Sequence, residues 1–386
     1  MAYAAAHRPG RSARPPIYAP GLERPPLAPL VEPYFPGDVA TMASGRILAV
    51  VSDGAAQSLA SICPDGTVSH PFPADLDGAP VLGVSGDGSR HAVASSYNAW
   101  GQRRFYLVTE SAAAGCAAAP LLEAMPSEER DLGALTIDRR TVAADDGEGL
   151  PYVLIGAQKK PGPLLVRVYG GNDVPTLAMA QTPFERLWLQ RGGRLLIPTL
   201  RGDARLPPWK TASSGDYQQR AVKDLFSVLD SLAARHELLP GQVTVMGVSL
   251  GAFTAARAAL ARPQLFGAAV LASGLLELEA RARQPSAGQT LGPAEGGFAA
   301  WFAGAPNAAA CSGLRFYVYA GAADRLVDAE GSRGFARYVS GLGYKTLLRL
   351  YAGADHALME RFDVAEDLFK DFDKEARAKA ACAGKP

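Results

Sequence analysis

The hydrophobic and polar positions divide the chain into two differently patterned regions. From residue 39 to about 135, short β-prone runs alternate with turn sequences such as "PDG" and "GDG". From about residue 136 onward, apolar runs of strand length alternate with amphipathic runs of helical period. The first pattern predicts antiparallel sheets. The second predicts a mostly parallel sheet covered by helices on both faces.

The expected elements follow from these runs. In the first region, strands are expected within 45–53, 58–66, 79–88, 89–97 and 103–110. In the second region, strands are expected within 150–158, 162–171, 191–202, 241–249, 265–274, 314–324 and 344–353, and helices over 216–236, 250–263, 329–343 and 364–381.

The predicted organisation has three parts. Residues 1–38 are rich in proline, which excludes a regular helix or a central strand, and they are expected to form an extended arm. Residues 39–135 are long enough for about two sheets of the propeller kind, whereas a closed propeller needs roughly four to eight. Residues 136–386 are expected to form one α/β domain.

Composition and charge exclude several kinds of partner. The chain has 386 residues, 20% of them charged, and a net charge of +1, which gives no basis for binding nucleic acid or a membrane surface. No apolar run approaches the roughly 20 residues of a membrane span. The amino terminus lacks the layout of a signal peptide, so a cytoplasmic location is expected, or a periplasmic one if the true amino terminus is missing.

The four cysteines are Cys63, Cys116, Cys311 and Cys382. They lie far apart and form no C-x-x-C, which argues against a zinc site or a disulfide framework. The prediction is therefore unpaired thiols in a reducing compartment.

The sequence "VTVMGVSLGAF" at 243–253 contains a candidate nucleophile. A strand is followed by Gly-x-Ser-x-Gly and then by small residues that open a helix, which is the context of a nucleophilic serine at a strand-to-helix turn. The motif alone also fits an ordinary glycine-rich turn. Ser249 needs a base, and the base needs an orienting acid.

Chain order supplies both partners. On hydrolase sheets of this type the order is serine, acid, histidine. Of the five histidines, only His356 follows Ser249, and Asp324 is the first aspartate after it. All three follow predicted strands, at the sheet edge where open α/β sheets bind ligands. Asp328 and Asp355 are the alternative acids.

Two groups are candidates for stabilising an oxyanion. One is the backbone N–H of Leu250, directly after the serine. The other belongs to the loop "VRVYGGND", where Tyr169 ends a strand and a glycine pair permits close backbone approach, although a simple tight turn is the alternative. The "RGD" at 201–203 directly follows a predicted strand, which disfavours an adhesion role.

Several segments together resemble the prolyl oligopeptidase family of serine peptidases. The resemblance covers about residues 140–375 and rests on "VYGGND", "RGGRLLIPTLRGDARLPPW", "VKDLFSVLDSLAARHELLPGQVTVMGVSLGAF", "AGAADRLVD" and "AGADHAL". The region 39–135 is similar to the last propeller blades of that family. The family implies an α/β-hydrolase fold and no metal or organic cofactor.

The resemblance also implies roles for particular residues. Ser249 would be the nucleophile, Asp324 the orienting acid and His356 the base. The hydroxyl of Tyr169 and the N–H of Leu250 would hold the oxyanion.

The chain departs from the family pattern at several positions. Most blades of the family's propeller are missing. Leu250 replaces an asparagine of the motif, Asn172 replaces an aromatic that lines the proline pocket, and Leu326 aligns with an arginine that binds a substrate carbonyl, with Arg325 one place away. Strict cleavage after proline is therefore not expected. Trp301 and Phe298 could line the pocket, but a core role is favoured for both.

The sequence therefore predicts a serine peptidase acting on short peptides through an acyl-enzyme. An esterase or acyl hydrolase with the same residues is one alternative. An inactive fragment that acts as an interaction protein is the other, because exposed strand edges of the incomplete propeller could pair with another copy of the chain.

Overall fold

The computed structural model of the chain describes residues 39–52, 57–69, 81–98, 100–126, 133, 135–156, 162–171, 176, 181–203, 215–216, 218–278, 295–308 and 313–383. The expected proline-rich arm at 1–38 lies outside them. Among the described residues, no helix has both the length and the apolar character needed to cross a membrane.

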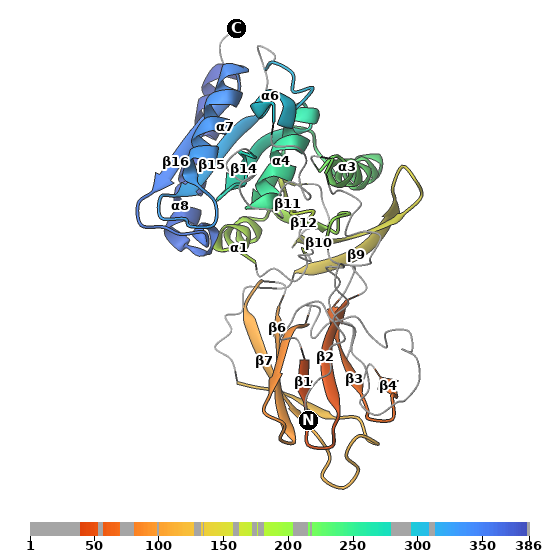
Figure 1. Cartoon of the computed structure of the whole chain (residues 1–386). Coiled ribbons are helices and arrows are strands. Elements are labelled where there is room, and N and C mark those ends of the chain that lie inside the picture. Colours follow the sequence, from red (N-terminus) through yellow and green to blue (C-terminus); the bar gives the residue numbers. More distant parts are fainter. Residues whose placement is uncertain are drawn as a thin grey trace. The chain divides into compact units, whose positions relative to one another are not determined.

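The chain divides into two compact units. One comprises Met1–Gly133 with Leu177–Ala180 and Ala204–Pro207. The other comprises Ala134–Thr176, Gln181–Asp203 and Pro208–Pro386. They are called here the β-rich unit and the α/β unit (Figure 1).

The α/β unit contains an eight-stranded sheet in the order β16-β15-β14-β13-β11-β12-β10-β9. The strands from β16 to β12 are parallel to their neighbours, whereas β10 pairs antiparallel with both β12 and β9. The bounds are β9 Thr136–Ala143, β10 Gly149–Gly156, β11 Leu164–Val168, β12 Arg194–Pro198, β13 Val243–Val248, β14 Phe266–Ala272, β15 Arg315–Gly321 and β16 Lys345–Tyr351.

Burial explains which strands are central. Every residue of β11, β12 and β15 is buried, as a strand covered on both faces requires, whereas the edge strands β9 and β16 are partly exposed along their length. The continuous apolar runs in the sequence are thus the sheet interior. The predicted α/β-hydrolase fold is confirmed.

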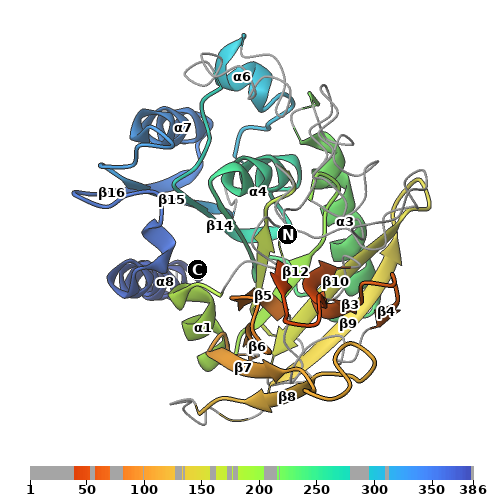
Figure 2. The same cartoon turned by 60° about the horizontal axis from the view of Figure 1, so that its bottom comes forward.

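Helices cover both faces of this sheet (Figure 2). Helices α1 and α8 pack together on one face, and α3, α4 and α7 lie on the other. The bounds are α1 Pro183–Gln190, α3 Gln219–Ala234, α4 Leu250–Ala261, α6 Gly297–Trp301, α7 Ala329–Gly341 and α8 Phe362–Ala383, with a 3-10 helix η2 at Leu358–Glu360.

Helix α1 was not expected from the sequence pattern. The start of this helix is marked by a capping box. The side chain of Thr182 accepts a hydrogen bond from the Glu185 amide, and the side chain of Glu185 accepts one from the Thr182 amide. Pro183 is the first residue of the helix. The helix has eight residues, so its apolar period is too short to stand out from the flanking sequence.

The β-rich unit holds two four-stranded antiparallel sheets, each in sequential strand order. This is the arrangement of propeller blades, and the sequence had predicted about two of them. The bounds are β1 Val39–Thr41, β2 Ile47–Ser52, β3 Gln57–Ile62 and β4 Val68–Ser69 in one sheet, and β5 Val81–Gly86, β6 His91–Tyr97, β7 Arg103–Thr109 and β8 Leu121–Ala124 in the other.

The two small sheets share one apolar core. It is built from the inward-facing residues of both, namely Ala40, Met42, Leu48, Val50, Leu59, Val84, Ala92, Ala94, Tyr106 and Val108. Alternate residues of the first sheet, such as Ile47 and Ala49, are buried on its opposite face, so this sheet is covered on both sides.

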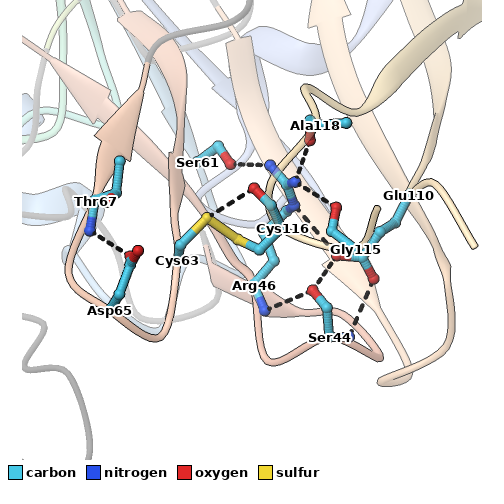
Figure 3. The surroundings of a disulfide bond; sticks show 10 residues. All are labelled: Ser44, Arg46, Ser61, Cys63, Asp65, Thr67, Glu110, Gly115, Cys116 and Ala118. Atoms are coloured by element: carbon cyan, nitrogen blue, oxygen red, sulfur yellow. Dashed lines mark hydrogen bonds and ion pairs between the residues drawn. A yellow bond between two sulfur atoms is a disulfide. The ribbon is translucent and has the colours of Figure 1, made fainter. Parts of the chain in front are cut away.

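A disulfide joins the two small sheets (Figure 3). It links Cys63, just after β3, to Cys116, in the connection from β7 to β8, with a Cα–Cα distance of 5.8 Å. The prediction of unpaired thiols is wrong for these two cysteines. Their separation of 53 positions carries no pairing signal in a linear sequence, because folding alone brings them together.

Arg46 reinforces the same junction (Figure 3). Its side chain is 1% exposed and pairs with the equally buried Glu110 at 3.3 Å. The guanidinium also donates to the hydroxyl of Ser61 and to the carbonyl oxygens of Gly115 and Ala118. A buried charge needs this degree of hydrogen bonding to offset its desolvation.

Candidate active site

Ser249 lies at a sharp turn between β13 and α4. The strand ends at Val248 and the helix begins at Leu250, so Ser249 alone joins them. Its backbone has φ 56° and ψ −122°, and sparsely populated conformations of this kind cost about 1–3 kcal/mol for a non-glycine residue. A serine on such a strained strand-to-helix turn presents its hydroxyl at the top of the sheet.

Two glycines make this turn sterically possible. A Cβ at Gly247 would lie 2.0 Å from the carbonyl oxygen of Gly251, and a Cβ at Gly251 would lie 2.3 Å from that of Val168. No side chain fits at these separations. The Gly-x-Ser-x-Gly spacing is therefore required by close backbone approach, and is not a chance feature of a chain rich in small residues.

Asp324 and His356 are hydrogen-bonded to each other. They follow the neighbouring strands β15 and β16. Nδ1 of His356 lies 2.8 Å from Oδ2 of Asp324, whose side chain is 1% exposed against 25% for that of His356. Oδ1 of Asp324 accepts hydrogen bonds from the amides of Leu326 and Val327. This fixed carboxylate engages Nδ1 and leaves Nε2 as the ring atom available for proton transfer.

Backbone contacts hold the loops of Asp324 and His356 together. A Cβ at Gly321 would lie 2.4 Å from the carbonyl oxygen of Ala354, and the amide of Ala323 donates to that same oxygen at 2.9 Å. The pairing of the acid with the histidine is therefore set by the contact between two loops, and not by the side chains alone.

The two alternative acids make other contacts. The side chain of Asp328 caps helix α7 by accepting a hydrogen bond from the amide of Glu330 at 2.9 Å. Asp355 is exposed and accepts one from the amide of Ala357 at 3.1 Å. The geometry favours Asp324 over both as the partner of His356.

Ser249 shares the carboxyl edge of the sheet with this pair. Strand β14 lies between β13 and β15, and the amide of Ser249 donates to Ala272 at the end of β14 at 3.0 Å. Among the described residues, no hydrogen bond joins the Ser249 hydroxyl to His356. In enzymes without substrate such bonds are often long and tighten on binding. The structure thus pairs Asp324 with His356 and places Ser249 at the same edge.

The loop after β11 contacts the turn that carries Leu250. Tyr169 directly follows β11, is 9% exposed, and accepts a hydrogen bond at its carbonyl oxygen from the hydroxyl of Thr254 at 2.8 Å. A Cβ at Gly171 would lie 2.6 Å from Cδ2 of Leu250. Leu250 is the first residue of α4, and the first N–H groups of a helix have no acceptor within it. Tyr169 and this N–H therefore come from adjoining segments.

The positions expected to decide specificity have mixed outcomes. Leu326 is 68% exposed and presents an apolar side chain beside Asp324. Asn172 lies outside the described residues. Trp301 is 1% exposed and its ring packs 5.1 Å from that of Phe298 in an aromatic cluster, which supports the favoured core role.

The Arg-Gly-Asp sequence at 201–203 is buried. Arg201 is 6% exposed and pairs with the buried carboxylate of Asp224, and Asp203 is completely buried. Burial excludes recognition of this sequence by an adhesion partner. Asp203 was not predicted as a site residue. The feature of the sequence that could have identified it is its position as an acid shortly after a strand, at the carboxyl edge of the sheet.

The pKa of Asp203 is raised to about 7, mainly because burial penalises the charged carboxylate. Hydrogen bonds from Thr176, Leu200, Gly170 and Gly171 act in the opposite direction. A carboxyl with a raised pKa close to candidate catalytic groups is typical of functional sites.

Comparison with curated proteins finds three uncharacterized peptidases. The chain is 28% identical over 153 residues to peptidase y4nA of Sinorhizobium fredii (strain NBRC 101917 / NGR234), which covers 38% of this chain and 21% of the relative. It is 26% identical over 147 residues to peptidase RP174 of Rickettsia prowazekii (strain Madrid E), covering 37% and 20%. The alignments thus span about a fifth of each relative.

Comparison with solved structures supports the fold. A chain from a study of two prolyl endopeptidases matches with a TM-score of 0.70 at 18% identity, over 86% of this chain and 51% of that one. A post-proline cleaving enzyme from Rickettsia typhi matches with a TM-score of 0.66 at 17% identity, over 85% and 49%. The Pyrococcus horikoshii acylaminoacyl peptidase matches with a TM-score of 0.65 at 13% identity, over 82% and 51%. The chain spans about half the length of these proteins.

The family comparison confirms the resemblance seen in the motifs. The model of the prolyl oligopeptidase family matches residues 181–373, half of the chain, and this stretch contains Ser249, Asp324 and His356. By this match the chain belongs to the prolyl oligopeptidase family.

Proposed function

We propose that the chain is a serine peptidase that cleaves short peptides through an acyl-enzyme, with Ser249 as nucleophile, His356 as base and Asp324 as orienting acid. The observation that carries the proposal is the 2.8 Å hydrogen bond between His356 and Asp324, at the sheet edge where the strained turn presents Ser249.

The first step is attack of Ser249 Oγ on the substrate carbonyl carbon. His356 Nε2 takes the hydroxyl proton, and Asp324 accepts the Nδ1–H bond that stabilises the resulting imidazolium. His356 then donates this proton to the departing amine as the carbon–nitrogen bond breaks. Water attacks the acyl-enzyme, again with His356 as base, and releases the acid and free Ser249.

The oxyanion formed in each step is bound by two donors. One is the backbone N–H of Leu250 and the other is the hydroxyl of Tyr169. Preorganised donors of this kind contribute about 2.7–4 kcal/mol each to stabilising the transition state. The contact between Gly171 and the Leu250 side chain supports the proximity of the two segments.

The alternative is an acyl or ester hydrolase that uses the same residues. The exposed apolar side chain of Leu326, beside the acid, favours it, because this position aligns with the family's carbonyl-binding arginine and itself contributes no cation. Turnover of matched peptide-amide and ester substrates separates the two: a peptidase cleaves both, whereas an ester hydrolase cleaves the ester alone.

A fluorophosphonate probe read by intact mass tests the serine site. We expect one adduct on the wild type, none on Ser249→Ala, and one on Ser227→Ala. Ser227 is a matched control, since its hydroxyl bonds to the carbonyl of Lys223 within helix α3. An adduct that persists on Ser249→Ala, or a folded wild type without any adduct, would refute the proposal.

We also propose that the chain folds in an oxidising compartment, such as a periplasm. The Cys63–Cys116 disulfide supports this, because disulfides persist in oxidising compartments and are rare where thiols are kept reduced. Alkylation of the protein from its native source, before and after reduction, should reveal two additional thiols after reduction. Equal alkylation in both samples would overturn it.

A further inference from the structure

Asp203 is a fully buried carboxylate that the proposed catalytic steps do not use. Its Oδ1 accepts a hydrogen bond from the amide of Gly170 at 3.0 Å. Its Oδ2 accepts one from the hydroxyl of Thr176 at 2.7 Å and one from the amide of Leu200 at 3.2 Å. One carboxylate therefore ties together the loop after β11 and the turn after β12.

The backbones of these two segments are also in direct contact. Gly202 has φ 108°, and a Cβ there would lie 2.3 Å from the carbonyl oxygen of Gly170. The amide of Asp203 donates to the carbonyl oxygen of Leu200 at 3.0 Å, which closes the turn that presents the carboxylate. The turn can reach the loop in this way because position 202 carries no side chain.

The bond from Gly170 to Asp203 fixes the backbone directly after Tyr169. The amide of Gly170 donates to Asp203, so this amide is directed into the protein and away from a substrate. The proposed oxyanion donor of this loop, the hydroxyl of Tyr169, belongs to the residue directly before Gly170. The carbonyl oxygen of Tyr169 accepts a hydrogen bond from Thr254, and the next residue, Gly170, donates its amide to Asp203. The backbone of Tyr169 is therefore fixed on both sides.

We propose that Asp203 is a positioning residue that fixes the oxyanion loop 169–171, and through it Tyr169, for catalysis. The inference rests on the proposed function, since it assigns Asp203 a role in the same reaction. Asp203 does not touch the substrate in this account; it acts through Tyr169.

The charged groups on neighbouring elements are engaged in pairs of their own. Arg167 of β11 pairs with Glu185 of α1 at 2.6 Å, and Arg201 pairs with Asp224 of α3. The donors to Asp203 described above are all neutral amides and a hydroxyl. Its protonation state therefore affects how the loop is held.

The acid limb of the pH profile should report this role. A protonated Asp203 presents an O–H on one oxygen and can no longer accept all of its hydrogen bonds, so lowering the pH through about 7 should loosen the loop. In the wild type, the logarithm of kcat/KM should therefore show a fall near pH 7 that requires the Asp203 carboxyl.

The main test is Asp203→Asn, assayed with p-nitrophenyl acetate and with the rate of fluorophosphonate labelling. We expect kcat and the labelling rate to fall roughly 10- to 100-fold, the loss associated with a small misplacement of a catalytic group, with KM within about threefold of wild type. The fall in activity near pH 7 that requires Asp203 should disappear. Asp371→Asn is the matched control, because it also removes a buried charge, one that bonds to Tyr319 and Arg349, and it should preserve the fall near pH 7.

A double-mutant cycle separates positioning from general destabilisation. If Asp203 acts through Tyr169, Asp203→Asn should have little further effect on kcat in a Tyr169→Phe background. Thr176→Val, which keeps the shape but removes the donor to Asp203, should lower kcat several-fold, and Thr176→Ser should restore it. The Thr176 pair tests the proposal even if Asp203→Asn does not fold.

The outcomes distinguish this inference from the proposed function. A folded wild type that is not labelled at Ser249 overturns the function and the inference with it. If the wild type is labelled normally, the inference alone is overturned when Asp203→Asn and Thr176→Val keep the wild-type kcat and Asp203→Asn keeps the fall near pH 7. Full additivity with Tyr169→Phe also overturns it.

Discussion

The α/β unit and the β-rich unit are held in shape by different means. In the α/β unit, strands such as β11 and β15 are buried along their whole length between two layers of helices. The β-rich unit has two small sheets with one shared core, joined by a disulfide and a buried ion pair. Small domains bury a smaller fraction of their surface, so covalent and ionic links contribute more to their stability.

The difference also explains where chemistry can reside. A large core can hold a strained residue such as Ser249 and a buried acid such as Asp203, because many other contacts offset their cost. In the β-rich unit the corresponding buried charge, Arg46, is surrounded by acceptors and serves to join the sheets. The comparison predicts that variants at the candidate active site of the α/β unit change activity, whereas variants at the junction of the two small sheets in the β-rich unit change stability.

The largest expected effect is that of Asp324→Asn. Replacing the acid of a serine triad leaves the geometry intact but favours the wrong histidine tautomer, so kcat should fall about 10⁴-fold while thermal stability stays near wild type. Steady-state kinetics on an ester substrate measure it. Asp328→Asn is the matched control and should retain activity. A similar loss in both variants would contradict the assignment of the acid.

The next effect is expected in the β-rich unit. Replacing both Cys63 and Cys116 by alanine opens a loop of 53 positions, for which the chain-entropy model gives about 4 kcal/mol of lost stability. Hydrogen exchange should accelerate in strands β2, β3, β6 and β7 and remain unchanged in β13 and β15. Equal acceleration in both sets of strands would break the comparison between the units.

A smaller effect is expected from pH on the α/β unit. The pKa of Asp203 is about 7 in the folded state against 3.8 for the unfolded reference, so between these values the folded protein binds the extra proton. The contribution to stability is complete below about pH 3.8 and is lost as pH rises through about 7. The free energy of unfolding should therefore change with pH by at most ~1.4 kcal/mol per pH unit because of Asp203.

Urea unfolding at several pH values, followed by exchange of α/β-unit amides, measures this dependence. In Asp203→Asn the contribution should disappear and the profile between pH 4 and 7 should become flatter. An unchanged profile in that variant would mean that another group titrates there.

The smallest effect is expected at the start of helix α1. Thr182→Ala removes one half of the capping box and should lower stability by about 1 kcal/mol. Thr182→Ser keeps the acceptor oxygen and should be close to wild type. The melting temperature of the two variants gives the comparison, and equal loss in both would show that the cap oxygen is not responsible.

Much of the fold could be read from periodicity because its central strands are continuously apolar. The seven strands and four helices expected after residue 136 all occur. Helix α1 was missed because it is short, and strands β1, β4 and β8 were missed because they have two to four residues each. Short elements carry too few positions for a period to be recognised. Strand β9 has eight residues but was missed because it is a polar, partly exposed edge strand without a continuous apolar run.

The sequence by itself determined the chemistry that this protein can offer. The order of Ser249, Asp324 and His356, the spacing of the flanking glycines and the alternation of strands and helices are local or ordinal properties, and they identify the family. Tertiary structure decided what depends on distant contacts: the hydrogen bond of Asp324 to His356, the pairing of Cys63 with Cys116, and the hydrogen bond of Asp203 to the loop after Tyr169. The physical reason is that a hydrogen bond or a disulfide depends on distance in space. Residues 32 to 53 positions apart are brought within that distance only by the packing of strands and sheets against one another.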